Sequence, residues 1–109
     1  MGNRTKAEFD RFKKAVEKWI DKLGLTDWNW EITFEELPEE THGRACFDKT
    51  ARLARIVYNK NANSNPLKYY KPEEVALHEV LHVLFADIVP DEKQVEEHKV
   101  IARLMKVLN

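Results

Sequence analysis

The spacing of hydrophobic residues along the chain predicts a succession of helices and strands. Between residues 5 and 23, hydrophobic side chains recur every three or four positions, and lysines and arginines occupy the opposite face. This spacing is typical of an amphipathic helix that packs on a sheet. Thr5 and Glu8 form a capping-box pattern at its start, and Gly24 stands where a helix commonly ends. The residues of the apolar face are Phe9, Phe12, Val16, Trp19, Ile20 and Leu23.

The segments that follow have the pattern of strands. Residues 28–34 alternate between large hydrophobic and polar side chains, which is the period of a strand with one buried face. Residues 44–48 and 52–59 flank a short turn, and we expect them to form a hairpin. The loop before them carries His42. We interpret this residue as a surface histidine, with a role in substrate binding as the alternative.

The next element predicted is a buried helix that begins at Pro72 and ends after Ala86. Proline suits the first position of a helix because its missing amide hydrogen would have no partner there. Beyond the first turn, every residue of this segment is apolar except His78, Glu79 and His82. A helix that is apolar nearly all round is buried, and ionisable groups in such a helix are costly unless they are paired or bound to a metal.

These three residues form the pattern His-Glu-x-x-His. Two histidines four residues apart lie on one face of a helix, so both imidazoles can bind one zinc ion at about 2.0–2.1 Å. Glu79 lies beside the pair, where it can accept a proton from a metal-bound water without binding the metal. The alternative is a pair of buried histidines that hydrogen-bond to the backbone or to glutamates.

A final helix should follow, because Pro90 ends the motif helix and Asp91 can cap a new one. Its apolar face consists of Val100, Ile101, Leu104, Val107 and Leu108. Glu97 falls at the centre of this face, and a carboxylate directed into a core requires a cation. We therefore predict Glu97 as the third zinc ligand, with water at the fourth position. The alternative for Glu97 is a pairing with an Arg or Lys at the core edge; Glu96 and His98 lie about 100° to either side.

Composition and charge limit the class of protein. The chain has 109 residues, of which 43% are hydrophobic and 34% charged, so we expect a single globular domain spanning residues 1–109. The formal net charge of −1 argues against an obligatory nucleic-acid partner. No apolar run reaches the roughly 18 residues of a membrane helix, and the N-terminus lacks the apolar core of a signal peptide. The single cysteine, Cys46, fits a cytoplasmic protein, and we expect a buried structural thiol rather than a zinc ligand.

The expected fold class is α+β. It comprises an N-terminal helix, a small three-stranded and mainly antiparallel sheet, the motif helix and a C-terminal helix. With His78, Glu79, His82 and Glu97, this order resembles the compact core of the zincin metallopeptidases, in particular the gluzincin branch and the ImmA/IrrE-like and SprT-like peptidases. The segment from Gly43 to Asn59 is similar to the strand pair of SprT-like domains. Their third ligand is a histidine, which makes His98 the alternative ligand here.

The resemblance implies a metallopeptidase with one zinc ion per chain. His78, His82 and Glu97 would bind the metal, and Glu79 would act as general base. The hydrogen-bond donor that stabilises the transition state would be one of four residues: Tyr58, Tyr69, Tyr70 or His98. A peptide or protein substrate would pair with an edge strand, either 44–48 or 52–59. The alternatives are a zinc-binding interaction module without turnover and a SprT-like, DNA-associated protease.

Overall fold

The computed structural model describes residues 4–38, 40–61, 70–86 and 94–108, and the side chains of all of these except 94–98. Its helices are α1 (Lys6–Lys22), α2 (Pro72–Ala86) and α3 (Gln94–Leu108). The strands are β1 (Asn29–Glu35), β2 (Gly43–Asp48) and β3 (Leu53–Asn59). The order of elements is that expected from the hydrophobic pattern, and the α+β class is confirmed. None of the described helices is long and apolar enough to span a membrane.

Helix α1 begins and ends as its sequence predicts. Thr5 is the N-cap residue: its side chain accepts a hydrogen bond from the Glu8 amide, and the Glu8 side chain accepts one from the Thr5 amide. Gly24 follows the helix with a positive φ of 69°, which glycine adopts without steric cost. The apolar face packs on the sheet through stacked rings, with Phe9 on Phe34 of β1 and Phe12 on Tyr58 of β3.

The sheet is mixed, and the expectation of a mainly antiparallel sheet was wrong. The strand order is β1-β3-β2; β1 pairs with β3 in parallel and β2 pairs with β3 antiparallel. The connection after β1 carries the chain past the position of β3 to the far edge, and the hairpin then returns β3 between its neighbours. The alternation of polar and hydrophobic side chains predicts a strand, but it does not indicate whether the neighbouring strand runs parallel or antiparallel to it.

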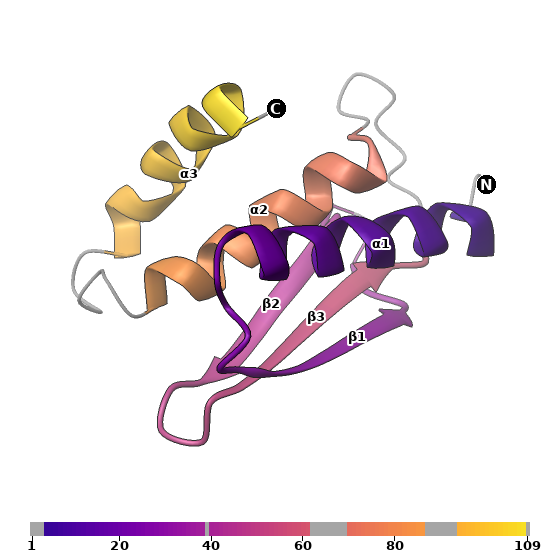
Figure 1. Ribbon diagram of the computed structural model, residues 1–109. Coiled ribbons are helices and arrows are strands. Elements are labelled where there is room, and N and C mark those ends of the chain that lie inside the picture. Colours follow the sequence, from indigo (N-terminus) through magenta and orange to yellow (C-terminus); the bar gives the residue numbers. More distant parts are fainter. Residues whose placement is uncertain (1–3, 39, 62–69, 87–93, 109) are drawn as a thin grey trace.

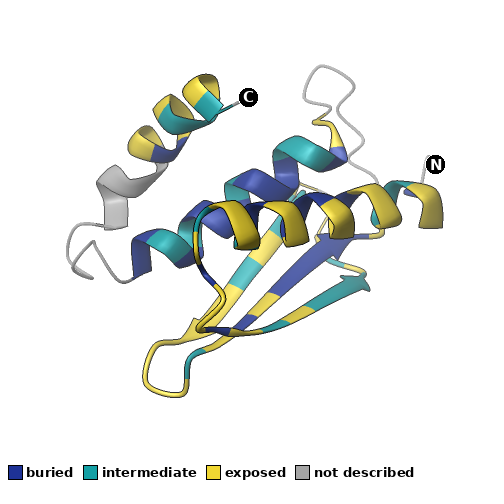
Figure 2. Cartoon of the chain, viewed as in Figure 1, coloured by how far each residue is buried: buried dark blue, intermediate teal, exposed yellow. Residues whose placement is uncertain are grey.

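Helices α1 and α2 lie side by side on one face of the sheet, and α3 lies beyond α2 (Figure 1). Helix α2 is buried along most of its length, whereas α1 exposes a full outer face (Figure 2). On α3, Ile101 is buried and Leu104 and Leu108 pack against the core, but Val100 and Val107 are exposed. The apolar face of this helix is therefore narrower than the sequence indicates.

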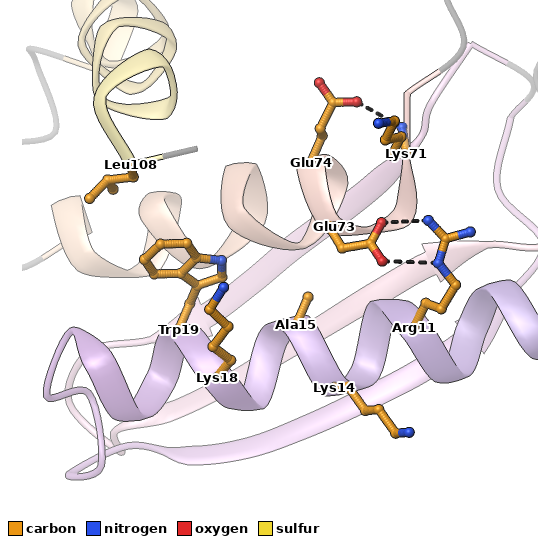
Figure 3. Close-up of a pocket in the computed structure, with 9 residues that line it drawn as sticks. All are labelled: Arg11, Lys14, Ala15, Lys18, Trp19, Lys71, Glu73, Glu74 and Leu108. Atoms are coloured by element: carbon orange, nitrogen blue, oxygen red, sulfur yellow. Dashed lines mark hydrogen bonds and ion pairs between the residues drawn. The ribbon is translucent and has the colours of Figure 1, made fainter.

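An ion pair joins the outer surfaces of α1 and α2. Two guanidinium nitrogens of Arg11 donate to the two carboxylate oxygens of Glu73, at 2.9 and 2.7 Å (Figure 3). It lines a surface pocket of about 900 Å³, together with Trp19 and Leu108. None of the residues that line this pocket belongs to the His-Glu-x-x-His motif. The pocket is therefore not a candidate for the expected zinc site, although it is large.

Candidate active site

The two motif histidines converge on one point of α2. The Nε2 atoms of His78 and His82 lie 3.2 Å apart, and the two rings are nearly edge to face with centroids 4.8 Å apart. Both side chains are half-buried in a helix whose other residues are mostly buried. The prediction that the two imidazoles share one helical face is confirmed.

Their separation fits a shared zinc ion. Two nitrogen ligands at 2.0–2.1 Å from a tetrahedral zinc ion lie about 3.3 Å from each other. The same separation allows a hydrogen bond between the two rings when no metal is bound. Among the described side chains, no group of three or more His, Cys, Asp or Glu residues could hold a metal ion. The side chains of Glu96, Glu97 and His98 lie outside the described residues, so the third ligand stays a prediction.

Glu79 is a buried carboxyl group at the same site. Its side chain lines a pocket with His78, yet the residue is only 7% exposed. Burial raises the pKa of Glu79 to about 8, against an opposing effect of the positive charge of Arg44. A nearby cation would favour its charged form. The residue is therefore a buried carboxyl group in the pocket wall with His78, and a cation beside it would favour its ionised, proton-accepting form.

The pocket has a volume of about 500 Å³ and is enclosed by the loop before β2, α2 and α3. Of the residues that we predicted from sequence, it brings together His78, Glu79 and Tyr70. Tyr58 lies elsewhere: it is fully buried in the core, stacked on Phe12. Tyr69 lies outside the described residues.

Gly43 allows α2 to approach the edge of the sheet. A Cβ atom at this position would lie 2.9 Å from Val75 Cγ1, 3.0 Å from the Val57 carbonyl oxygen and 3.3 Å from Glu79 Cγ. Real Cβ atoms essentially never approach another atom to less than 3.0 Å, and contacts of 3.0–3.4 Å are tight, so a larger residue requires a shift of the Val75 side chain, of α2 or of the strand. The absence of a side chain at Gly43 thus positions Glu79 against β2.

The strand beside the motif helix is at the edge of the sheet. Among the strands that the structure describes, β2 pairs with β3 alone, and β3 is the central strand. Of the two candidate segments, 44–48 therefore lies at an edge of the sheet and 52–59 does not, and the pairing of a substrate with this edge stays a prediction. Cys46 on β2 is exposed, so the expectation of a buried thiol was also wrong. The hairpin leaves one side of β2 without a partner in the sheet, which the sequence pattern alone does not reveal.

His42, which the sequence predicted to be a surface histidine with a role in substrate binding as the alternative, is a pocket residue. It lines the pocket with His78 and Glu79, and it is half-buried rather than a surface histidine. Its ring packs edge to face on Tyr70, with centroids 4.7 Å apart, and it contacts Arg4. The sequence places His42 in the loop next to Gly43, just before a predicted strand, but gives no sign of which element covers it.

No match was found when the chain was compared with protein-family models, curated proteins and solved structures.

The candidate site lies on α2 and in the adjoining pocket. Its described components are two convergent imidazoles, one buried carboxyl group and a pocket beside an edge strand.

Proposed function

We propose that this protein is a zinc-dependent metallopeptidase of the gluzincin type, with His78 and His82 as zinc ligands and Glu97 as the third. The observation that carries the proposal is the 3.2 Å approach of the two Nε2 atoms on the helix that also bears buried Glu79. A structural zinc site needs no such carboxyl group, whereas peptide hydrolysis needs a general base beside the reacting water.

A zinc ion held by these residues would acidify a bound water and polarise the carbonyl of the scissile bond. Glu79 accepts a proton from the attacking water and passes it to the leaving amine when the carbon–nitrogen bond breaks. Because Glu79 lies in the wall of the pocket, it would be accessible to both the attacking water and the leaving amine. Burial strengthens its basicity once it is ionised, because the charged form is poorly solvated there.

The exposed edge of β2 suits an extended peptide substrate. This strand lies against α2, which carries the motif, and on its outer side it pairs with none of the described strands, so an extended peptide could add there. A peptide added in this way would run past the pocket that Glu79 and His78 line. The cleavage site would then lie where the substrate strand passes the motif helix.

The test combines metal content with hydrolysis of a peptide library, followed by mass spectrometry. The wild-type protein should contain about one zinc ion per chain, which strong chelators remove. Glu79→Gln should keep the zinc and abolish cleavage, because an amide cannot act as the base. Glu17→Gln is the control: this glutamate lies on the exposed face of α1 and does not line the pocket, so the substitution should leave cleavage unchanged.

The outcomes separate the proposal from its alternatives. A protein that binds no zinc contradicts the proposal, as does a Glu79→Gln variant that cleaves as fast as the wild type. Zinc bound by four protein ligands, with no cleavage of the library, would instead indicate an interaction module. Cleavage that occurs only in the presence of DNA would indicate a SprT-like, DNA-associated protease.

A further inference from the structure

A buried arginine holds the His42 ring from outside the motif. Arg4 is only 8% exposed. Its guanidinium donates to the carbonyl oxygens of His42 and Asn59, at 2.8 and 3.2 Å, and its Nη2 atom lies 2.6 Å from Nδ1 of His42. The same group stacks on the ring of Tyr58, 4.5 Å from the centroid. Arg4 is therefore fixed by several contacts, and it fixes the His42 backbone and ring together.

The contact with Arg4 determines which ring nitrogen carries the proton. A guanidinium has five N–H donors and no acceptor, so Nδ1 of His42 must accept the hydrogen bond. In a neutral imidazole, one nitrogen accepts and the other donates. The proton of His42 consequently resides on Nε2, so the N–H group stands at the end of the ring that is turned away from Arg4.

The loop that carries His42 is held in place next to Glu79. The preceding part of the loop is bound by the buried side chain of Asn59, which donates to the carbonyls of Pro38 and Thr41. Gly43, the next residue, packs against α2 at the position of Glu79. His42 thus lies in the wall of the pocket, and contacts of the residues on both sides of it hold it there.

We propose that His42 is a catalytic residue whose Nε2–H donates a hydrogen bond to the oxyanion of the transition state, and that Arg4 is a positioning residue that sets its tautomer. This inference rests on the proposed peptidase function. It names a donor outside the four candidates predicted from sequence, of which only Tyr70 is described in the pocket.

In this step, the oxygen of water bonds to the carbonyl carbon of the substrate, and one water proton moves to Glu79. The carbonyl π electrons move to its oxygen, which becomes the oxyanion that His42 stabilises. The carbon–nitrogen bond then breaks, the proton on Glu79 moves to the leaving nitrogen, and the products are a carboxylic acid and an amine. A donor directed at the developing charge stabilises this oxyanion more than it stabilises the neutral carbonyl.

The first measurement is the nitrogen-15 NMR spectrum of the histidine side chains in the metal-free protein at neutral pH. The wild type should show His42 with its proton on Nε2. Arg4→Gln, whose amide also offers an acceptor, should shift this tautomer, whereas Arg4→Lys should preserve it because an ammonium only donates. A wild-type His42 with its proton on Nδ1 overturns the inference.

The second measurement is the binding of a phosphinic peptide, Ac-Ala-ψ[PO₂CH₂]-Ala-NH₂, to the zinc-loaded protein. Its tetrahedral PO₂⁻ group resembles the oxyanion. His42→Phe keeps an aromatic ring without the donor and should weaken binding about 10- to 100-fold, as expected for a hydrogen bond to a charged group. His42→Gln, whose amide N–H can replace Nε2–H, should recover most of the affinity.

Acetohydroxamate, a small zinc chelator, is the control ligand and should bind the wild type and both His42 variants alike. Equal affinity of the phosphinic peptide for the wild type and His42→Phe, with acetohydroxamate still bound, overturns the role of His42 and leaves the peptidase proposal intact. Failure of the wild type to bind zinc overturns both.

Discussion

Gly43 on β2 leaves room for the side chain of Glu79 on α2: a Cβ atom on Gly43 would lie 3.3 Å from Cγ of Glu79. The same atom would lie closer still to Val75 Cγ1 and to the Val57 carbonyl oxygen, at 2.9 and 3.0 Å. The carbonyl oxygen belongs to the backbone of the central strand, so it cannot move aside as a side chain can. The edge strand and the motif helix are therefore closely packed at the position of Glu79.

The Gly43→Ala variant should be less stable than the wild type by about 1–3 kcal/mol, the usual cost of an added group in a packed site. Urea denaturation measures this difference. Cys46→Ala on the same strand is the control, because Cys46 is exposed and its truncation should change stability by less than about 0.5 kcal/mol. Equal stability of Gly43→Ala and the wild type would show that α2 does not approach β2 this closely.

Burial of Glu79 should make the metal-free protein less stable as the pH rises. The pKa of Glu79 is raised from 4.5 to about 8 in the folded state. The folded protein therefore keeps the proton that the unfolded chain loses near pH 4.5. Stability from this source is complete below the unfolded pKa and is lost as the pH rises through the folded one.

Glu79→Gln has no such group, so it should gain stability relative to the wild type between pH 5 and pH 8. The gain is roughly 2–5 kcal/mol, at about 1.4 kcal/mol per pKa unit. Urea denaturation in the presence of a chelator at the two pH values measures it. A difference between the two proteins that is independent of pH would mean that Glu79 is already ionised without metal.

The third ligand is tested by zinc titration of three variants against a competing chelator. Glu97→Ala should weaken zinc binding by more than about 100-fold, since the loss of an outer-shell partner alone costs about 10–100-fold. Glu96→Ala should have little effect. Residue 97 stands four positions before buried Ile101, on the spacing of one helical face.

His98→Ala is the decisive comparison among the three. His98 stands four positions before Ala102, which lines the pocket with Met105. Residues four positions apart share one face of a helix, so His98 is on the same helical face as a pocket residue and stays the alternative ligand. A loss of affinity confined to His98→Ala would indicate the three-histidine pattern of SprT-like domains and would overturn the gluzincin assignment.

The Asn59→Ala variant should destabilise the protein by roughly 2–4 kcal/mol, at about 1 kcal/mol for each hydrogen bond lost. The buried Asn59 side chain accepts from the amides of Leu37 and Asn61 and donates to the carbonyls of Pro38 and Thr41. Thermal denaturation is the measurement, and Asn29→Ala, at an exposed position, is the control. Asn59→Asp keeps only the two accepted bonds, so it should also be destabilised. A fully stable Asn59→Asp would refute this account.

The Arg11–Glu73 pair should contribute only about 0.2–1 kcal/mol, because both side chains are largely exposed. The hydrogen bond from Arg11 lowers the pKa of Glu73. The contribution is therefore present above the unfolded pKa of the carboxyl group and is lost as the pH falls through the folded one. A double-mutant cycle with Arg11→Gln and Glu73→Gln at pH 7 and pH 3 measures it. A coupling that persists unchanged at pH 3 or in high salt would contradict this account.

The amino-acid sequence by itself determined the elements and the helical part of the site. The capping box of α1 joins Thr5 and Glu8, three positions apart, and His78 and His82 meet because they are four positions apart. In both cases, the partners lie within about one helical turn, so local geometry brings them together whatever the rest of the chain does. The third ligand depends on how α3 meets α2, and it stays a prediction.

Only the tertiary structure decided what surrounds the motif. The parallel pairing of β1, the edge position of β2 and the contact of Arg4 with His42, 38 positions away, join segments that are distant in sequence. Hydrophobic periodicity records which face of an element is buried, but it carries no information about the element that covers it. For this reason, His42 resembled a surface histidine and Cys46 a buried thiol until the sheet order and the loop before β2 placed one in the pocket wall and the other on an exposed edge strand.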